Sequence, residues 1–283
     1  KVAVIGAGGK MGTRTSNNLV TKFPDKFDVK LVETFPPAVE RIEKERGLKV
    51  TPVDEALAFA DVVIFAVPDT LIKKLSAEYV PMLKPGTVFL ILDPAAAVAK
   101  ELTLRDDCTF GVAHPCHPSY FKWQKEEEAY QDRFGGEGGH QDIVMSCIQG
   151  DEEKFKLAQE TARCMYRADK AFVMTSEQIA FLEPTLVETL GATCCYAMAE
   201  TVNEAVKRGI DREAAVSFLT GHVFNLTANF LGYLPGNPPV SDACKVALEI
   251  GNHLVLRDDW KKIWDDELLR KVIATMLHPE TSQ

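Results

Sequence analysis

The sequence lacks long hydrophobic runs and clusters of basic residues. No uninterrupted apolar stretch reaches the ~18 residues that a membrane-spanning helix requires, which argues against a membrane protein of the helical type. The formal net charge is −9 and the Lys and Arg residues are scattered, so nucleic acids and acidic membranes are poor partners. No signal peptide is recognisable, and we expect a cytoplasmic protein.

Paired cysteines of the redox or zinc-binding type are also missing. The seven cysteines are an odd number, form no C-x-x-C pair, and several lie within apolar stretches. This usage predicts reduced, buried thiols in an intracellular protein rather than a disulfide framework.

The first dozen residues contain a glycine-rich turn between a predicted strand and a predicted helix. The run Val2-Ala-Val-Ile5 is typical of a buried strand in a parallel sheet, and a helix is expected over 13–22. Glycines between them allow a tight turn and the close approach of a pyrophosphate to the helix N-terminus. The spacing departs from G-x-G-x-x-G, but the last gap is kept. The predicted cofactor-binding residues are Gly6, Gly8, Gly9, Lys10, Met11 and Gly12.

An acidic residue follows the second predicted strand, 29–32. Glu33 lies 21 residues after Gly12, where a carboxylate accepts hydrogen bonds from a ribose 2′-hydroxyl and repels a 2′-phosphate. A solvated strand end is the alternative for a single carboxylate. Together with the glycine turn, Glu33 favours NAD over NADP as the cofactor.

Strands alternate with helices as far as residue 175, which predicts an N-terminal Rossmann domain with a doubly wound parallel sheet over 1–175. Val67 and Pro68 end an apolar strand at the edge where such sheets bind ligands, so both should line the cofactor site. From 176 to 283 the strand signal disappears and long apolar helices follow. We expect an all-α C-terminal domain that binds substrate and pairs with a second copy to form a homodimer.

The motif His114-Pro-Cys-His117-Pro follows directly on a predicted strand, 109–113. A histidine at the carboxyl edge of the sheet can take the proton of a substrate hydroxyl, so His114 and His117 are candidate acid/base residues. Asp93, at the end of the preceding strand, could orient an imidazole or bind a substrate hydroxyl; capping of the next helix is the alternative. A divalent metal bound by one of these histidines with a carboxylate also stays open, although its ligands are unknown.

Residues 122–140 combine a charge run with many glycines, and we expect a mobile excursion that either covers the site or has no role.

The helical half carries a few polar residues within apolar surroundings. Glu183 and Glu188 are expected to face a polar cleft, since a buried glutamate needs a partner. His222, Asn225 and Asn229 recur at helical spacing and suit a polyhydroxylated ligand, or else form a network between helices.

The motifs together resemble the 6-phosphogluconate and β-hydroxyacid dehydrogenase superfamily and, more closely, the D-apionate oxidoisomerase group. The resemblance covers nearly the whole chain and rests on GAGGKMG at 6–12, VPD at 67–69, DPAA at 93–96, HPCHP at 114–118, FGG at 134–136, EPTLVET at 183–189 and the Gly221-His222 step. It implies an NAD(P)-dependent oxidoreductase that oxidises the secondary hydroxyl of a branched sugar acid, with a skeletal rearrangement to a 3-oxo acid.

One departure from the superfamily concerns the general base. Lysine-dependent β-hydroxyacid dehydrogenases carry a Lys-x-x-x-Asn pair on the first long helix, whereas no lysine occurs between Glu177 and Glu204. His114 or a glutamate such as Glu188 is then the candidate base. Two other functions stay open: a plain prephenate-like or β-hydroxyacid dehydrogenase without rearrangement, and a non-catalytic NAD-binding sensor.

Overall fold

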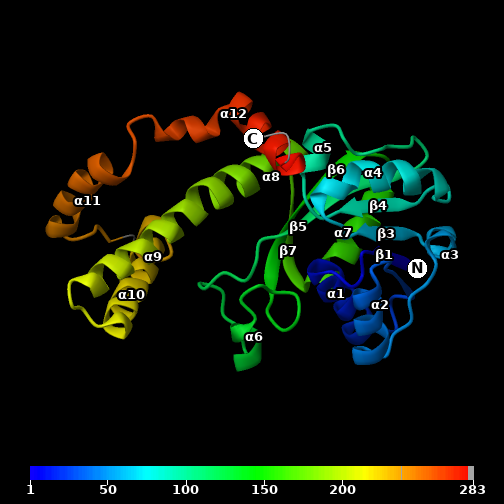
Figure 1. Cartoon of the computed structure of the whole chain (residues 1–283), viewed down its shortest axis with the longest axis horizontal. Coiled ribbons are helices and arrows are strands. Elements are labelled where there is room, and N and C mark those ends of the chain that lie inside the picture. Colours follow the sequence, from blue (N-terminus) through cyan, green and yellow to red (C-terminus); the bar gives the residue numbers. More distant parts are fainter. Residues whose placement is uncertain (237, 280–283) are drawn as a thin grey trace. The chain divides into compact units, whose positions relative to one another are not determined.

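In the computed structural model, which describes residues 1–236 and 238–279, the chain divides into two compact units (Figure 1). The first unit comprises residues 1–180 and 270–283, and the second comprises residues 181–269. The boundary predicted at 175/176 lies close to this division, while the C-terminal residues return to the first unit. The described residues contain no helix long and apolar enough to cross a membrane.

A seven-stranded sheet forms the centre of the first unit, in the order β2-β1-β3-β4-β5-β6-β7. Strands β1 and β3 are continuous apolar runs and are completely buried, as expected of strands covered by helices on both faces. The strands are β1 (Val2–Ile5), β2 (Val29–Val32), β3 (Val62–Phe65), β4 (Val88–Ile91), β5 (Thr109–Pro115), β6 (Gln141–Gln149) and β7 (Ala168–Val173).

The first five strands in spatial order are parallel, and β6 then pairs antiparallel with β5. The predicted Rossmann-type fold class with a doubly wound, mainly parallel sheet is confirmed, and the antiparallel pairing of β6 with β5 is the exception to the parallel pattern. The reason lies in the connection, because a chain that leaves β5 and enters β6 at the same edge needs no crossover helix.

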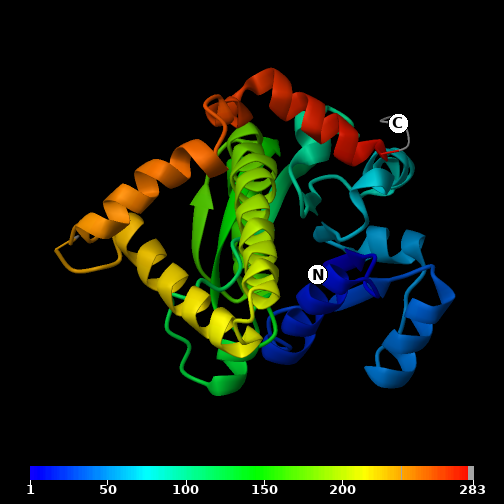
Figure 2. The same cartoon turned by 60° about the vertical axis from the view of Figure 1, so that its left-hand side comes forward.

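Helices cover both faces of this sheet (Figure 2). Helix α1 contacts α7 on one face, and α3 and α4 both contact η3. The side chain of Asp151 caps α7 by accepting the N–H of Lys154 at 2.9 Å. The helical segments are α1 (Lys10–Asn17), η1 (Asn18–Lys22), α2 (Pro36–Glu40), η2 (Arg41–Glu45), α3 (Val53–Phe59), α4 (Asp69–Tyr79), η3 (Val80–Met82), α5 (Ala95–Val98), α6 (Glu127–Gln131), α7 (Glu152–Tyr166) and α8 (Ser176–Ala180).

The second unit is helical, as predicted, and α9 packs against both η4 and α10. Pro184 lies inside η4, where widened π-type turns accommodate the missing N–H of the proline without ending the helix. The remaining segments are η4 (Phe181–Gly191), α9 (Ala192–Lys207), α10 (Arg212–Phe230), α11 (Asp242–Val255), η5 (Trp260–Trp264) and α12 (Asp266–Leu277), whose last eight residues belong to the first unit.

The expectation of buried thiols holds only in part. Cys108 and Cys164 are buried, whereas Cys194 and Cys195 on α9 are exposed, and the described residues form no disulfide.

Candidate functional site

The glycine turn joins β1 to α1 at the point where the strand order changes direction between β1 and β3. Ligands of open α/β sheets bind outside the carboxyl ends of the strands at such a point. Gly6 has a φ of +77°, which a residue with a side chain rarely adopts. A Cβ on Gly12 would lie 2.1 Å from the Gly6 carbonyl oxygen, so only glycine lets α1 pack this closely on the turn. The N–H groups of the first turn of α1 have no partner within the helix, and such a cradle fits a pyrophosphate.

Glu33 is fixed beside this turn by backbone groups. Its Oε2 accepts the N–H of Gly8 at 2.9 Å, and its Oε1 accepts the N–H groups of Thr34 at 2.8 Å and Phe35 at 3.0 Å. A Cβ on Gly8 would lie 2.9 Å from Glu33 Oε2 and 2.6 Å from the Ala38 Cβ, which explains why residue 8 has no side chain. The Glu33 carboxylate is half-buried, and these three backbone hydrogen bonds hold it in one orientation beside the turn.

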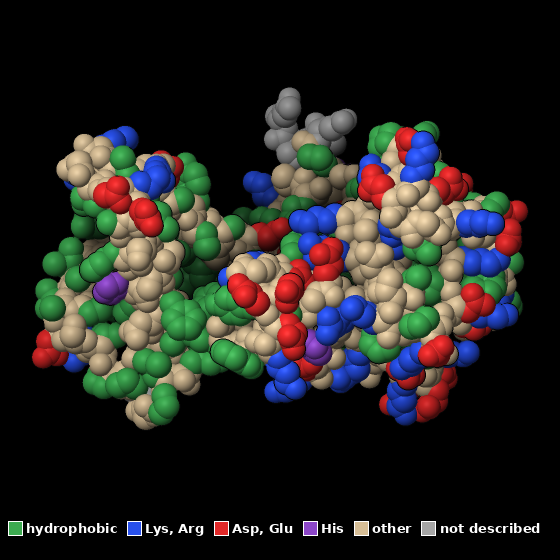
Figure 3. Space-filling model, turned by 90° about the horizontal axis from the view of Figure 1, so that it is seen from below, with side chains coloured by type: hydrophobic (Ala, Val, Ile, Leu, Met, Phe, Trp, Pro, Cys, Tyr) green, Lys and Arg blue, Asp and Glu red, His purple; other side chains and the backbone are tan. Residues whose placement is uncertain are grey.

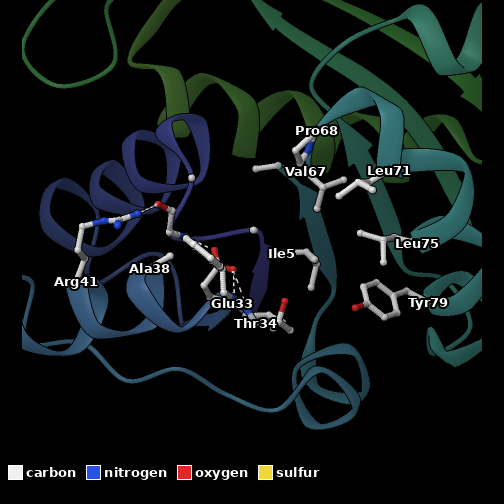
Figure 4. A pocket seen from close by; sticks show the side chains of 16 residues that line it. Ile5, Glu33, Thr34, Ala38, Arg41, Val67, Pro68, Leu71, Leu75 and Tyr79 are labelled. Atoms are coloured by element: carbon white, nitrogen blue, oxygen red, sulfur yellow. Dashed lines mark hydrogen bonds between the residues drawn. The ribbon is translucent and has the colours of Figure 1, made fainter. Parts of the chain in front are cut away.

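A pocket of about 350 Å³ opens at this place (Figure 4). Three elements line it: the end of β1 with the glycine turn, the segment after β2, and the end of β3 with helix α4. Of the predicted cofactor-binding residues, Gly6, Gly8, Gly9, Glu33, Val67 and Pro68 line the pocket. Lys10, Met11 and Gly12 lie in the first turn of α1 outside this lining.

His114 and Asp93 lie at the ends of neighbouring strands β5 and β4. The His114 Nδ1 lies 2.7 Å from the Leu92 carbonyl oxygen. A carbonyl only accepts, so Nδ1 carries the hydrogen, and the neutral ring then has its lone pair on Nε2. Asp93 Oδ1 accepts the N–H of Ala95 at 2.8 Å, at the start of the helix that follows, which corresponds to the capping alternative.

Asp93 also lies near a buried tyrosine beneath the site. The Tyr166 hydroxyl donates to the Ala113 carbonyl oxygen at 3.1 Å. Burial raises the pKa of Tyr166 far above its usual range, and the negative charge of Asp93 adds to the effect. This tyrosine is therefore a neutral donor that supports the backbone next to His114.

His117 takes a different direction from His114. It has a φ of +59°, a left-handed conformation that is uncommon for a non-glycine residue. Its Nδ1 lies 2.7 Å from the Phe134 carbonyl oxygen, and the two rings contact each other with centroids 4.6 Å apart and planes tilted by 53°. Lys10 Nζ lies 3.9 Å from the centroid of the same Phe134 ring, and the Arg14 guanidinium lies 4.6 Å from it. The HPCHP turn thus sends its two imidazoles to separate partners.

The glycine run after Phe134 is bonded to one carboxylate, and the expected mobility of this excursion stays a prediction. Asp132 Oδ2 accepts the N–H groups of Glu137, Gly138 and Gly139 at 2.9–3.0 Å, and Arg14 reaches Oδ1 at 3.3 Å. Burial alone would raise the pKa of Asp132, but these donors outweigh it and the pKa is lowered.

Sequence reasoning missed Asp132, Arg14 and the role of Phe134. An acidic residue shortly before a glycine run is the one signal that could have indicated such a turn.

The predicted substrate residues of the helical unit lie on two of its elements. Glu183 is half-buried and Glu188 exposed, both on η4, while His222 and Asn225 are exposed on α10. His222 Nδ1 lies 2.7 Å from the Phe218 carbonyl oxygen, and Asn229 donates to the Pro238 carbonyl oxygen. Within residues 1–236 and 238–279, no three His, Cys, Asp or Glu side chains gather as metal ligands. The roles of these residues and of a metal stay predictions.

Comparison with protein families divides the chain between residues 111 and 122, well before the structural division at 180/181. Residues 122–277 match the C-terminal domain of phosphogluconate dehydrogenase (decarboxylating), and residues 1–111 match the NADPH-binding domain of acetohydroxy acid isomeroreductase.

Curated relatives match along nearly the whole length of the chain. The chain is 72% identical over 283 residues to the D-apionate oxidoisomerase of Blautia hydrogenotrophica, which covers 100% of this chain and 98% of that protein. It is 42% identical over 274 residues to the D-apionate oxidoisomerase of Cupriavidus necator, with 96% and 98% covered.

Solved structures agree with this fold. A semialdehyde dehydrogenase NAD-binding protein from Cupriavidus necator, in complex with calcium and NAD, has a TM-score of 0.92 and 41% identity, covering 97% of this chain and 98% of that chain. An NADH-preferring ketol-acid reductoisomerase from an uncultured archean shares the fold alone, with a TM-score of 0.65 and 19% identity over 99% and 83% of the two chains. The glycine motif, the HPCHP turn and these full-length matches lead to one conclusion: the chain belongs to the D-apionate oxidoisomerase family and is an enzyme of the oxidoreductase type.

Proposed function

We propose that this enzyme oxidises a CH–OH group of D-apionate with NAD and isomerises the oxidised sugar acid to a 3-oxo acid. The full-length identity to D-apionate oxidoisomerases supports this substrate. The observation that carries the proposal is the position of His114, whose tautomer is set by Leu92 at the same sheet edge as the dinucleotide pocket.

NAD is the proposed cofactor because Glu33 stands where the adenosine ribose would lie. A carboxylate accepts from a ribose hydroxyl and repels a 2′-phosphate. The solved relative that contains NAD supports this choice. Bound in the pocket, the nicotinamide supplies the hydride acceptor.

His114 is proposed as the general base. Nε2 takes the hydroxyl proton as the substrate carbon loses hydride, and the positive charge that develops on the ring is stabilised by the Leu92 carbonyl at Nδ1. His117, the other histidine of the turn, has its Nδ1 bonded to Phe134, so we propose that it binds substrate or assists proton transfer through Nε2. Asp93, Glu183, His222 and Asn225 are proposed substrate ligands, and Glu188 is an alternative base.

A homodimer is proposed because the helical unit leaves many large apolar side chains exposed. Phe218 is 70% exposed, and Leu254 and Val255 of α11 are 80% and 74% exposed. On the face drawn in Figure 3, hydrophobic side chains gather over these helices, whereas charged side chains are spread over the first unit. Burial of such a surface by a second copy is the expected solution in an enzyme that we propose to be cytoplasmic. A monomeric mass by sedimentation would contradict it.

The proposed function is tested by incubating the enzyme with D-apionate and NAD, following NADH and identifying the product by NMR. A rearranged 3-oxo acid is expected. A product with its skeleton intact would indicate a plain dehydrogenase, and NAD binding without turnover of any sugar acid would indicate a sensor. Parallel assays with Mg²⁺ or Ca²⁺ and with EDTA test whether a divalent metal is required.

His114→Asn tests the proposed base. The Asn amide can still donate to the Leu92 carbonyl, but no group replaces Nε2. We expect kcat to fall by roughly 10²–10⁴-fold, the usual contribution of general base catalysis, with NAD affinity unchanged. Retained turnover would reassign the base to another group, with Glu188→Gln as the next variant.

A further inference from the structure

The pocket is lined in part by a positively charged side chain that has no role in the proposed binding of NAD. Arg41, the first residue of η2, lines the pocket together with Glu33. Its Nη2 donates to the Gly8 carbonyl oxygen at 3.1 Å and its Nη1 to the Pro37 carbonyl oxygen at 3.3 Å. A guanidinium has five N–H donors, so these two bonds leave donors for a ligand.

Arg41 and Glu33 hold the two polar groups of one residue. Glu33 accepts the Gly8 N–H, and Arg41 donates to the Gly8 carbonyl. Figure 4 shows the two side chains on either side of this part of the turn. No carboxylate among the described residues forms an ion pair with Arg41, which is exposed. The charges that would attract and repel a 2′-phosphate therefore lie next to each other.

The comparisons with known proteins include both an NADPH-binding family and an NAD-binding relative. The family model that matches residues 1–111 is described as an NADPH-binding domain, whereas the solved relative at 41% identity holds NAD. A site in which one residue excludes NADP and a neighbouring residue could bind it accounts for both findings.

We propose that Arg41 is an anchor for the 2′-phosphate of NADP and that the charge of Glu33 outweighs its attraction. The inference rests on the proposed dinucleotide function of the pocket. A 2′-phosphate would place roughly two negative charges beside the Glu33 carboxylate. The repulsion between the phosphate and Glu33 outweighs the attraction between the phosphate and Arg41. Once Glu33 is neutral, the attraction remains and the discrimination reverses.

Glu33→Gln is the decisive variant, because the amide oxygen of Gln still accepts a backbone N–H where the carboxylate did. Binding of 5′-AMP and 2′,5′-ADP is measured by calorimetry, which isolates the adenosine end from catalysis. The wild type is expected to prefer AMP. Glu33→Gln is expected to bind 2′,5′-ADP roughly 10- to 100-fold more tightly than AMP, the range given by one or two charge-assisted hydrogen bonds.

Arg41→Met in the Glu33→Gln background must remove this preference. Lys44→Met is the matched control: Lys44 lies on the same segment η2, is exposed, pairs with Glu40 and does not line the pocket. It removes the same charge, and the preference for 2′,5′-ADP should persist.

Two results would overturn the proposal: Glu33→Gln binding AMP as tightly as 2′,5′-ADP, or the double variant keeping the preference. If Glu33→Gln does not fold, the wild type supplies the test. There, Arg41→Met must weaken 2′,5′-ADP at least about fivefold more than AMP, and equal weakening refutes the anchor. A wild type that binds neither NAD nor AMP would instead refute the proposed function itself.

Discussion

Replacement of Gly12 by Ala tests how the dinucleotide turn is built. The added Cβ would lie 2.1 Å from the Gly6 carbonyl oxygen and 2.8 Å from the Ala7 Cα. Both obstacles are backbone atoms, so no side-chain rotation relieves the contact. To restore an ordinary contact distance, α1 must move away from the turn by more than about 1 Å, which opens the closest helix–strand contact of the pocket.

The expected cost follows from this geometry. Overpacking of a well-packed site costs about 1–3 kcal/mol, and we expect about 3 kcal/mol because the backbone itself must shift. In a chain of this size that lowers Tm by roughly 6–12 °C. Affinity for NAD should fall by at least about tenfold, since the first-turn N–H groups of α1 move with the helix.

Gly9→Ala is the matched control in the same turn. Its Cβ would lie 3.4 Å from the Gly6 carbonyl oxygen, an ordinary contact distance, and residue 9 has a φ of −71°. Its Tm should stay the same or rise slightly, because alanine restricts the unfolded chain. Thermal unfolding and NAD calorimetry on both variants give the comparison. Equal Tm and equal NAD affinity for Gly12→Ala and the wild type would refute this account of the turn.

Four further predictions concern the excursion and the C-terminus. Asp132→Asn should destabilise the enzyme by about 1.5–3 kcal/mol in urea, because three N–H groups lose a charged acceptor; an unchanged midpoint would contradict the role of the carboxylate. Since the pKa of Asp132 is lowered on folding, its contribution should be complete above pH ~4 and be lost as the pH falls through the lower folded value, as acid unfolding of wild type and variant would show. Phe134→Leu should lower kcat, whereas Phe134→Tyr should retain it, because the tilted aromatic ring contacts the His117 imidazole; equal rates for both would exclude this role. Glu101→Gln should increase hydrogen exchange over 270–279, since Glu101 accepts from His278 at 2.8 Å; unchanged exchange would show that this bond does not hold that segment.

The local sequence pattern was sufficient to predict those elements whose conformation depends mainly on residues adjacent in the chain. The apolar run Val2–Ile5 and the glycines after it predicted a strand, a turn and a helix, because short-range sterics and the buried strand pattern allow little else there. Glu33 could be predicted for the same reason, since its place after the second strand follows from the fold. Helices in the second unit followed from apolar periodicity. The structure adds the cap of α10, where Asp211 accepts the Ala214 N–H at 2.9 Å.

Only the tertiary structure decided where distant residues meet. The reversal of β6, the bond between His117 and Phe134 and the placement of Arg41 against Gly8 join residues far apart in sequence or on separate elements. HPCHP predicted two imidazoles at one sheet edge, but a left-handed turn at His117 sends the second toward the glycine-rich excursion. Such contacts depend on the summed packing of many elements and could not be derived from the sequence. The glycine turn depends on the steric limits of a few adjacent residues, and for that reason it could be derived.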